Sequence, residues 1–558
     1  MPEQFYTDYF QRRLGALKQE RDSFMPHWKE LSDFIQPRRG RYTLTDRNKG
    51  DRRYQKIINS KGTQAHNIAR AGMLAGVMSP SRPWFALGSQ DPEMMEYAPV
   101  KNWLYDVERL FRAIYNKSNL YNMSPTMLGE LLMFATGAMT HLDDFDDVAR
   151  FYTHTVGSYM ISQNSKFQVD TFVREFEMTV EQMIGEFGIT NVSPTVKNAY
   201  DLGNYDTWFP VVQFIEPNAN AKRSNLLSSN KPFRSVTYEP GCNDKNKVLR
   251  IKGFDEFPVY VPRWDLTGED IYGTDCPAMT ALGDIKGLQI EEKRKAQAID
   301  KMVNPPLQGP ASLANRPVNS LPGGTNLFDQ TGSNQKLEPV YKVEPRIQEL
   351  MLDIQRVEQR IDKAFYVDMF LAISNMEGIQ PKNQLELSQR NQERLLQLGP
   401  VLERVHGEFL LKLIDRTFNQ CVRAKILPPA PKELQGSPLK VEFVSTLAQA
   451  QRAVAVGGIE RLAGYIGGLA AAGAQGAWDK FDVDQSIDEY GSMIGVPPRV
   501  IVPDDVVAER RQQAQKQQAQ ERAAMLANSM ANTAKTAADA QTSEPSVLSN
   551  IASRMAGR

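Results

Sequence analysis

The sequence has little cysteine and no excess charge of either sign. Three cysteines occur in 558 residues, at Cys242, Cys276 and Cys421, and no two of them form a CxxC pair. This spacing indicates neither a disulfide framework nor a zinc knuckle, and it suits a reducing cytoplasm. Lysine plus arginine number 66, and aspartate plus glutamate also number 66. The balanced charge argues against a protein that clamps nucleic acid tightly.

Long hydrophobic runs are also missing. The N-terminus lacks the basic start and apolar core of a signal peptide. The most apolar stretch, from Ile459 to Ala477, is rich in Gly and Ala and contains Arg461. We therefore expect a buried helix there rather than a membrane span, and no membrane partner.

Signatures of nucleotide hydrolysis, zinc proteolysis and esterase chemistry are absent, since no GxxxxGK[ST], HExxH or GxSxG string occurs. The five histidines form no i, i+4 pair, so we expect each to be structural or exposed. They are His27, His66, His141, His154 and His406. The string HLDDFDD, which begins at His141, lacks the glycine and final glutamate of a calcium loop, so a solvated turn is favoured. We predict no enzyme activity, no catalytic residue, no metal and no cofactor.

The composition is that of a folded protein, with 41% hydrophobic and 24% charged residues. The length predicts two or more packed regions. Helical spacing of apolar residues predicts helices over 5–35, 57–78, 100–115 and 125–138, the first with a break near Pro26. Between residues 139 and 262, aromatic and β-branched residues at near period two predict strands. The expected fold class is α+β, predominantly helical.

Two long helical runs enclose a segment of different composition. Residues 277–306 begin and end with proline, and about 26 helical residues form a rod of roughly 40 Å. Its apolar stripe is narrow: Ile285, Leu288, Ala296, Ile299 and Val303. The second helix runs from 346 to 372, and residues 307–345 between the two are dense in Pro, Gly and Asn. Rods with so narrow a stripe are expected to pack beside copies of themselves.

Three lysines of the first rod, Lys286, Lys293 and Lys301, fall close to one helix face. One interpretation is a solvated face that Glu291 and Glu292 neutralise. The other is a face that lines a pore and meets DNA phosphate transiently. Both interpretations remain open from the sequence.

The C-terminal part is predicted to be helical with one strand. A long helix from Leu385 to Lys425 is expected to kink at Gly399 and Pro400. LKVEFVS is a strand candidate, Gly/Ala-rich helices follow to Val496, and the Gln/Ala-rich tail has plausible helicity but no core of its own. Two tryptophans, Trp84 and Trp264, are expected to be core anchors rather than stacking platforms for bases.

Several strings of residues, in one order along the chain, resemble the head-to-tail connector family of short-tailed bacteriophages. The string FPVYVPRWDLTGEDIYGTDCPAMTALGDIKGLQ contains the most specific ones. They are Arg263 with Trp264, Gly268, Tyr272 with Gly273, Pro277 to Met279, and Asp284 to Lys286. Further matches are SPSRPWF, VNPP, PGG, AFYVDMF and LLQLGPVLERV. The chain departs from the family at QPKNQLELSQR, where the family usually has a string like Met-Thr-Ala-Thr-Glu, so the match does not define a channel-facing loop there.

The resemblance implies a portal architecture: a wing, a stem of two helices, an inserted clip and a helical crown. The corresponding ranges are 1–138 and 139–276 for the wing, 277–304 and 346–372 for the stem helices, 305–345 for the clip, 373–440 for the channel-loop region and kinked wing helix, 441–505 for the crown, and 506–558 for the tail. Candidate clip residues are Pro322, Gly323, Gly324 and Phe328. Candidate channel residues are the three lysines of the first rod.

The same resemblance implies the partners and the location. We expect a homo-oligomeric, usually dodecameric ring at the portal vertex of the virion, assembled in the host cytoplasm, with double-stranded DNA in its channel. The terminase large subunit, a tail adaptor, and the major capsid and scaffolding proteins are the other expected partners. The alternatives are an internal virion or scaffold-type interaction protein and, less favoured, a DNA-packaging enzyme subunit.

Overall fold

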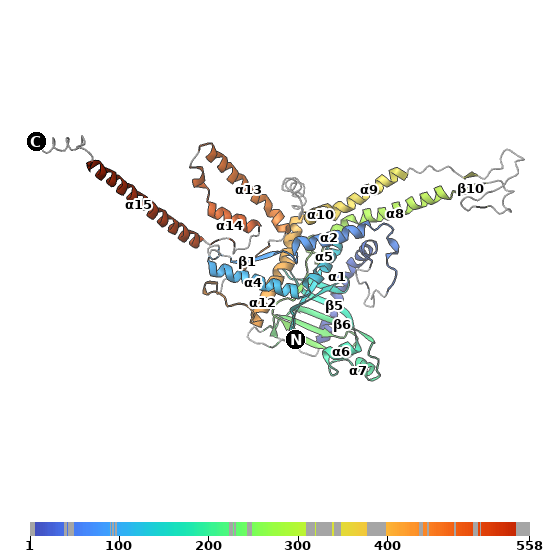
Figure 1. Ribbon diagram of the computed structural model, residues 1–558. Coiled ribbons are helices and arrows are strands. Elements are labelled where there is room, and N and C mark those ends of the chain that lie inside the picture. Colours follow the sequence, from blue (N-terminus) through green and yellow to red (C-terminus); the bar gives the residue numbers. More distant parts are fainter. Residues whose placement is uncertain are drawn as a thin grey trace. The chain divides into compact units, whose positions relative to one another are not determined.

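The computed structural model describes residues 6–37, 50–89, 97–221, 230–242, 248–308, 347–375, 398–434, 439–443, 446–473, 476–494 and 504–542, with a few single positions and the pair 338–339 between them. It is predominantly helical with small antiparallel sheets (Figure 1), which confirms the predicted α+β class. The chain forms two compact units. The first contains Met1–Ala86, Val107–Leu427 and Val441–Arg452, and the second contains Leu87–Asp106, Pro428–Lys440 and Ala453–Arg558.

A five-stranded antiparallel sheet in the first unit packs against the N-terminal helix α1 (Tyr6–Ile35). The strand order is β4-β5-β6-β7-β8. These strands are Tyr159–Gln163, Val169–Thr179, Trp208–Pro217, Phe233–Tyr238 and Arg250–Phe254. Side chains alternate between the two faces, so Val212 and Phe214 of β6 point to α1 and meet Phe10 there. The predicted β-rich middle is confirmed.

The other face of this sheet is covered by two short helices, α6 (Val180–Phe187) and α7 (Pro194–Asp201). Thr179 begins α6 with a capping box, in which its hydroxyl accepts from the backbone N–H of Gln182 and the Gln182 side chain accepts in return. The two faces are therefore covered in part, mainly at β5 and β6, while Ile251 and Lys252 of the edge strand β8 are exposed.

A three-stranded sheet joins β3 (Val148–His154), β2 (Ala138–Asp144) and β9 (Val259–Tyr260) in that order. Helices α2 (Lys61–Val77), α4 (Ala98–Lys117) and α5 (Leu120–Phe134) precede it in the chain, with the strand β1 (Phe85–Ser89) between the first two. Buried residues line both α5 and β3, and the two elements contact each other. Trp84 and Trp264 are both buried, which confirms their predicted role as core anchors.

Helix α1 is continuous through Pro26, so the predicted break is wrong. Pro26 itself is exposed, whereas Trp28 and Leu31 on the next turns are fully buried. Trp28 stacks on Phe24 and meets the edge of Tyr272. Packing on both sides of the proline stabilises the helix against the missing backbone hydrogen bond.

The two predicted rods are present as α8 (Pro277–Val303) and α9 (Ile347–Ala364). The second rod does not run on as one helix, because Tyr366 has a left-handed backbone with φ of 55° and the chain restarts as α10 (Val367–Asn375). Helix α10 lies so close to α2 that a Cβ added at Gly72 would stand 2.4 Å from the Cβ of Phe370. The change of direction at Tyr366 is what lets α10 reach this position.

The last helix of the first unit changes its winding. Residues 398–405 are α-helical, His406–Leu410 form a π-helical turn, and α12 follows as Leu411–Ala424. The predicted kink at Gly399 and Pro400 stands at the edge of the described residues, so the π turn is the irregularity that the structure defines. Such turns insert one extra residue into a helix.

The second unit is described by β12 (Leu439–Phe443), α13 (Thr446–Ala471), α14 (Val483–Ile494) and α15 (Asp504–Thr542), parts of the first two belonging to the first unit. The predicted strand LKVEFVS and the predicted C-terminal helices are therefore present. The expected burial of the helix from Ile459 is wrong for the single chain, because Leu462 and Tyr465 are exposed. A mainly apolar cavity of about 580 Å³ lies between α13 and α14, lined by Ile459, Ile487 and Tyr490 among others. Arg511 of α15 forms an ion pair with Asp484 of α14 at 2.6 Å.

Candidate functional site

The rods α8 and α9 lie side by side and leave the body of the first unit together (Figure 1). The beginning of α8 is buried, with Ile285 and Leu288 fully covered. On α9, the buried residues Ile354, Val357 and Ile361 recur every three or four positions and continue the helix–helix contact. The base of the pair is thus part of the subunit's own core.

The outer end of the pair is not covered in the single chain. The stripe that is buried at Ile285 and Leu288 continues to Ile299 and Val303, which are 42% and 71% exposed. Further large apolar side chains are exposed at the same end of the two helices. They are Met302, Met351 and Leu352, and Leu307 is exposed just beyond the end of α8. A two-helix rod has too few neighbours to bury such residues, so the stripe needs another surface.

The three candidate lysines do not have equal surroundings. Lys286 forms an ion pair with Glu30 of α1 at 2.5 Å and lies over the Phe34 ring. Lys293 and Lys301 are exposed on the outer part of α8 and have no ion-pair partner within 4.0 Å in the described part of the chain. Of the three candidate lysines, Lys293 and Lys301 are therefore the two that lack an ion pair among the described residues.

The segment between the rods is described at its two ends only. Leu307–Gln308 (β10) pairs in antiparallel fashion with Glu338–Pro339 (β11), so the insert leaves and returns at one place. This pairing fits the predicted compact insert. The candidate clip residues Pro322, Gly323, Gly324 and Phe328 lie outside the described residues.

A buried arginine joins the strand segment before α8 to the π turn. Arg263 has a side chain only 2% exposed, and its guanidinium donates to the Glu408 carboxylate through Nε at 3.0 Å and also through Nη2. Its remaining N–H groups donate to the Gln163 side chain and to the backbone oxygen of Phe167, at 3.0 and 2.9 Å. A charge this deeply buried is stable only with such complete pairing.

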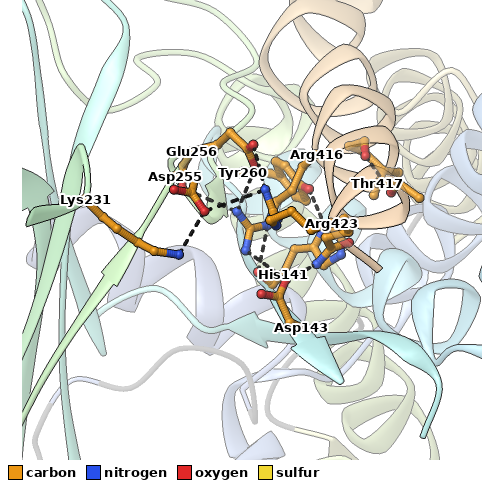
Figure 2. A network of polar contacts seen from close by, with 11 residues as sticks. His141, Asp143, Lys231, Asp255, Glu256, Tyr260, Arg416, Thr417 and Arg423 are labelled. Carbon is orange, nitrogen blue, oxygen red and sulfur yellow. Dashed lines mark hydrogen bonds and ion pairs between the residues drawn. The ribbon is translucent and has the colours of Figure 1, made fainter. Parts of the chain in front are cut away.

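A second arginine ties α12 to the three-stranded sheet (Figure 2). Arg416 donates to the backbone oxygen of His141 at 3.2 Å and to Glu256 at 3.3 Å, and it forms an ion pair with Asp143 at 3.5 Å. Arg423, also on α12, donates to the second oxygen of Glu256 at 3.1 Å.

The histidines beside this network are held neutral. His141 Nδ1 lies 2.6 Å from the Tyr260 hydroxyl, and burial together with the Arg416 charge holds the pKa of His141 well below its usual value. Burial lowers the pKa of His154 to about 3. His66 and His406 are also buried, and His27 is exposed, so the expectation that each histidine is structural or exposed is confirmed for the five side chains.

The residues Tyr272 and Gly273, which belong to the motif that carries the resemblance, pack closely against distant parts of the chain. Tyr272 is buried against Trp28, and its hydroxyl accepts from the backbone N–H of Ile161 at 3.2 Å. The backbone N–H of Gly273 donates to Thr136 at 2.8 Å, and a Cβ added at Gly273 would stand 2.1 Å from the backbone oxygen of Ala135. Arg416 and Glu256, by contrast, carried no sequence signal, because nothing in their local pattern marks them as partners.

The string HLDDFDD forms the end of β2 and the turn to β3, so the predicted solvated turn is correct for residues 145–147 and wrong for His141, which is a buried strand residue. The Asp144 carboxylate accepts from the backbone N–H groups of Asp146 and Asp147 at 2.8 and 3.2 Å. Within the described residues, no group of three or more His, Cys, Asp or Glu side chains is placed to hold a metal ion. No described helix combines the length and apolarity needed to cross a bilayer. The features described here are the buried contacts of Arg263 and Arg416, the close packing at Gly273, and the exposed outer surface of α8 and α9.

Comparisons with known proteins agree with this arrangement. A family described as bacteriophage head to tail connecting protein matches residues 7–502. The chain is 44% identical over 541 residues to the portal protein of Salmonella phage epsilon15, covering 97% of each chain. It is 43% identical over 559 residues to a probable portal protein of Bordetella phage BPP-1, covering all of both chains.

Among solved structures, the neck of an empty gene transfer agent particle is similar at a TM-score of 0.39 and 13% identity, over 81% of this chain and 96% of that one. The family match and the two relatives cover nearly the whole sequence. They confirm the resemblance that the ordered strings indicated. This chain belongs to the bacteriophage head to tail connecting protein family.

Proposed function

We propose that this chain is the portal subunit of a phage virion, a structural protein that forms a ring at one capsid vertex. Double-stranded DNA is packaged, retained and ejected through that ring. Family membership and the two portal relatives, each more than 40% identical over nearly the full length, support this function. The role is structural and places the protein at the junction of head and tail.

The observation that carries the ring is the partly covered rod pair. Its base belongs to the subunit core, while Ile299, Val303 and Met351 face solvent at its outer end. A closed ring gives every rod a neighbour on both sides, which covers these residues without leaving a free edge. A dodecamer is the proposed number of subunits.

The proposed parts of the subunit follow the chain order. Helices α8 and α9 form the stem, and residues 305–345 form the clip. Residues 1–276 and the helix around α12 form the wing, α13 and α14 belong to the crown, and α15 extends beyond it. The clip docks first the terminase large subunit, a separate motor protein, and later a tail adaptor, while other surfaces meet capsid and scaffolding proteins.

The alternatives are less well supported. A helical scaffold or internal virion protein does not need the five-stranded sheet, which packs against α1 on one face and against α6 and α7 on the other. A packaging enzyme subunit needs a phosphate loop or a carboxylate cluster for metal, and the acidic string at His141 is used in a turn instead. We therefore propose that the subunit has no enzyme activity of its own.

The ring is tested by placing charge on the uncovered stripe. For Val303→Asp, we expect the protein concentration below which rings dissociate to rise at least tenfold. The reason is that a carboxylate loses its hydration when it is buried in an apolar contact. Analytical ultracentrifugation and electron microscopy of the purified protein measure this. Melting of the subunit is expected to stay within about 0.5 kcal/mol of the parent, since Val303 is exposed.

The matched control is Leu202→Asp, which changes a similarly exposed leucine at the end of α7, outside the rods. Rings of this variant are expected to be unchanged. A wild-type protein that stays monomeric at every concentration would contradict the proposed function. If the rings of Val303→Asp are as stable as those of the parent, the exposed stripe on the rods takes no part in ring assembly.

The channel proposal concerns the two exposed lysines of α8. Lys293→Gln with Lys301→Gln is expected to leave rings intact and to lower the salt sensitivity of DNA retention in packaged heads, because each removed cation loses its phosphate contact. DNA release from heads at rising salt concentration measures the effect. Loss of the ring in this variant would show that the lysines hold subunits together instead.

A further inference from the structure

One hairpin tip presents an aromatic side chain entirely to solvent. Strands β2 and β3 are joined by a three-residue turn between Asp144 and Val148, which face each other in register. Phe145 in this turn is fully exposed, and Asp143 and Asp146 beside it are exposed as well. Phe145 thus adds nothing to the core of the subunit, although a turn position favours small or polar residues.

The turn is held in one conformation. Besides the two hydrogen bonds that Asp144 accepts, Lys117 of α4 donates to the backbone oxygen of Asp146 at 2.7 Å and forms an ion pair with Asp147 at 3.3 Å. Arg150 of β3 also pairs with Asp144, at 3.7 Å. A rigid tip loses little conformational entropy when it binds, which favours a contact role for Phe145.

A surface of opposite charge lies elsewhere on the same unit. Gln289 of α8 accepts from the backbone N–H groups of Ile58 and Asn59 at 2.6 and 2.8 Å, which fixes the segment before α2 against the rod. Exposed apolar and basic side chains occur together on these two segments. We call them the basic–apolar surface: Arg52, Tyr54, Ile58, Ile290 and Arg294.

The charges of this surface are available for a partner. Arg52 and Arg294 are exposed and have no ion-pair partner within 4.0 Å among the described residues, and Glu291 is the carboxylate of α8 whose charge interacts with Arg294. The tip offers what such a surface lacks, namely an aromatic ring beside the exposed carboxylate of Asp146, whereas the Asp143 carboxylate already pairs with Arg416 at 3.5 Å. Apolar burial with surrounding opposite charges is the usual composition of a specific protein contact.

We propose that the Phe145 tip of one subunit docks on the basic–apolar surface of the next subunit. A ring requires a head-to-tail contact, in which two different patches of the chain meet. The tip and the surface are such a pair, on different elements and with complementary charge. This inference rests on the proposed function, since it names the contact by which copies of the portal subunit join.

A disulfide cross-link tests the contact in the assembled ring. Phe145→Cys and Ile58→Cys are placed in one chain in a Cys242→Ser background, because Cys242 is the partly exposed native thiol while Cys276 and Cys421 are buried. Mild oxidation is expected to give a ladder of covalent multimers on a non-reducing gel. Each single-cysteine variant is expected to give none.

Charge reversal provides a second measurement. Asp146→Lys is expected to raise the dissociation concentration of rings about tenfold, and Arg294→Glu in the same chain to restore it. Phe145→Ala is expected to weaken rings by a similar factor. Phe167→Ala, a half-exposed phenylalanine in the turn between β4 and β5, is the matched control and leaves rings unchanged.

The outcomes separate the inference from the proposed function. Rings visible by electron microscopy without a ladder, and without rescue by Arg294→Glu, overturn the docking contact and leave the portal function standing. Absence of wild-type rings overturns both. Oxidation that instead links the Phe145→Cys chain to capsid protein, with no ladder of portal subunits, assigns the Phe145 tip to another partner and also overturns the contact between subunits.

Discussion

Replacing Arg263 with methionine is expected to destabilise the first unit by about 3–5 kcal/mol, since it leaves the Glu408 carboxylate without its buried partner. The melting temperature of the isolated subunit, followed by circular dichroism, measures the loss. Glu408→Gln is expected to cost less, because the amide still accepts one hydrogen bond while Arg263 keeps its contacts to Gln163 and Phe167.

The double variant Arg263→Met with Glu408→Gln completes a cycle that isolates the pair. Its cost is expected to be smaller than the sum of the two single costs. Lys231→Gln is the control, because the ion pair of Lys231 with Asp255 is partly exposed and contributes at most about 1 kcal/mol. If the Arg263→Met protein is as stable as Lys231→Gln, the Arg263–Glu408 pair does not stabilise the contact between the segment before α8 and the π turn.

Gly273→Ala is expected to be nearly as damaging, although it adds one methyl group. The new Cβ would stand 2.1 Å from the backbone oxygen of Ala135 and 2.7 Å from the Ala135 Cβ. Backbone atoms cannot rotate away as a side chain can, so the segment after the motif must shift, and we expect a loss of about 3 kcal/mol. The same thermal melt measures it.

Gly185→Ala is the matched control for this variant. Gly185 lies in the middle of α6, and no atom stands within 4 Å of the position of its added Cβ. Alanine is the better helix former by up to about 1 kcal/mol, so this variant is expected to be slightly more stable than the parent. Equal melting temperatures of Gly273→Ala and Gly185→Ala would contradict the close packing at Gly273.

Much of the fold could be predicted because its elements are long and periodic. The helix at 277–303 was bounded by prolines, and the sheet region was marked by alternating aromatic residues. The break at Tyr366 could not be predicted, because it depends on the close approach of α10 to Gly72, far away in sequence. The break predicted at Pro26 is wrong because tertiary packing keeps α1 helical through this local helix breaker.

The functional surfaces were predicted less completely. Lys286, Lys293 and Lys301 follow one pattern in the sequence, yet only Lys286 meets a carboxylate from another element, Glu30. The network of contacts around Arg416 could not be predicted from the sequence, because its partners lie in segments more than 100 residues away. Ion pairs between distant segments leave no periodic trace in a sequence.

The π turn at His406–Leu410 affects how one helix meets the rest of the unit. Glu408 and Arg416 are eight positions apart, and in a regular α-helix their side chains would point about 80° away from each other. The wider winding of the π turn reduces that angular offset. Both residues bind the segment between β8 and α8, Glu408 through Arg263 and Arg416 through Glu256. The extra residue of the π turn thus changes the relative direction of two side chains that connect this helix to the same chain segment.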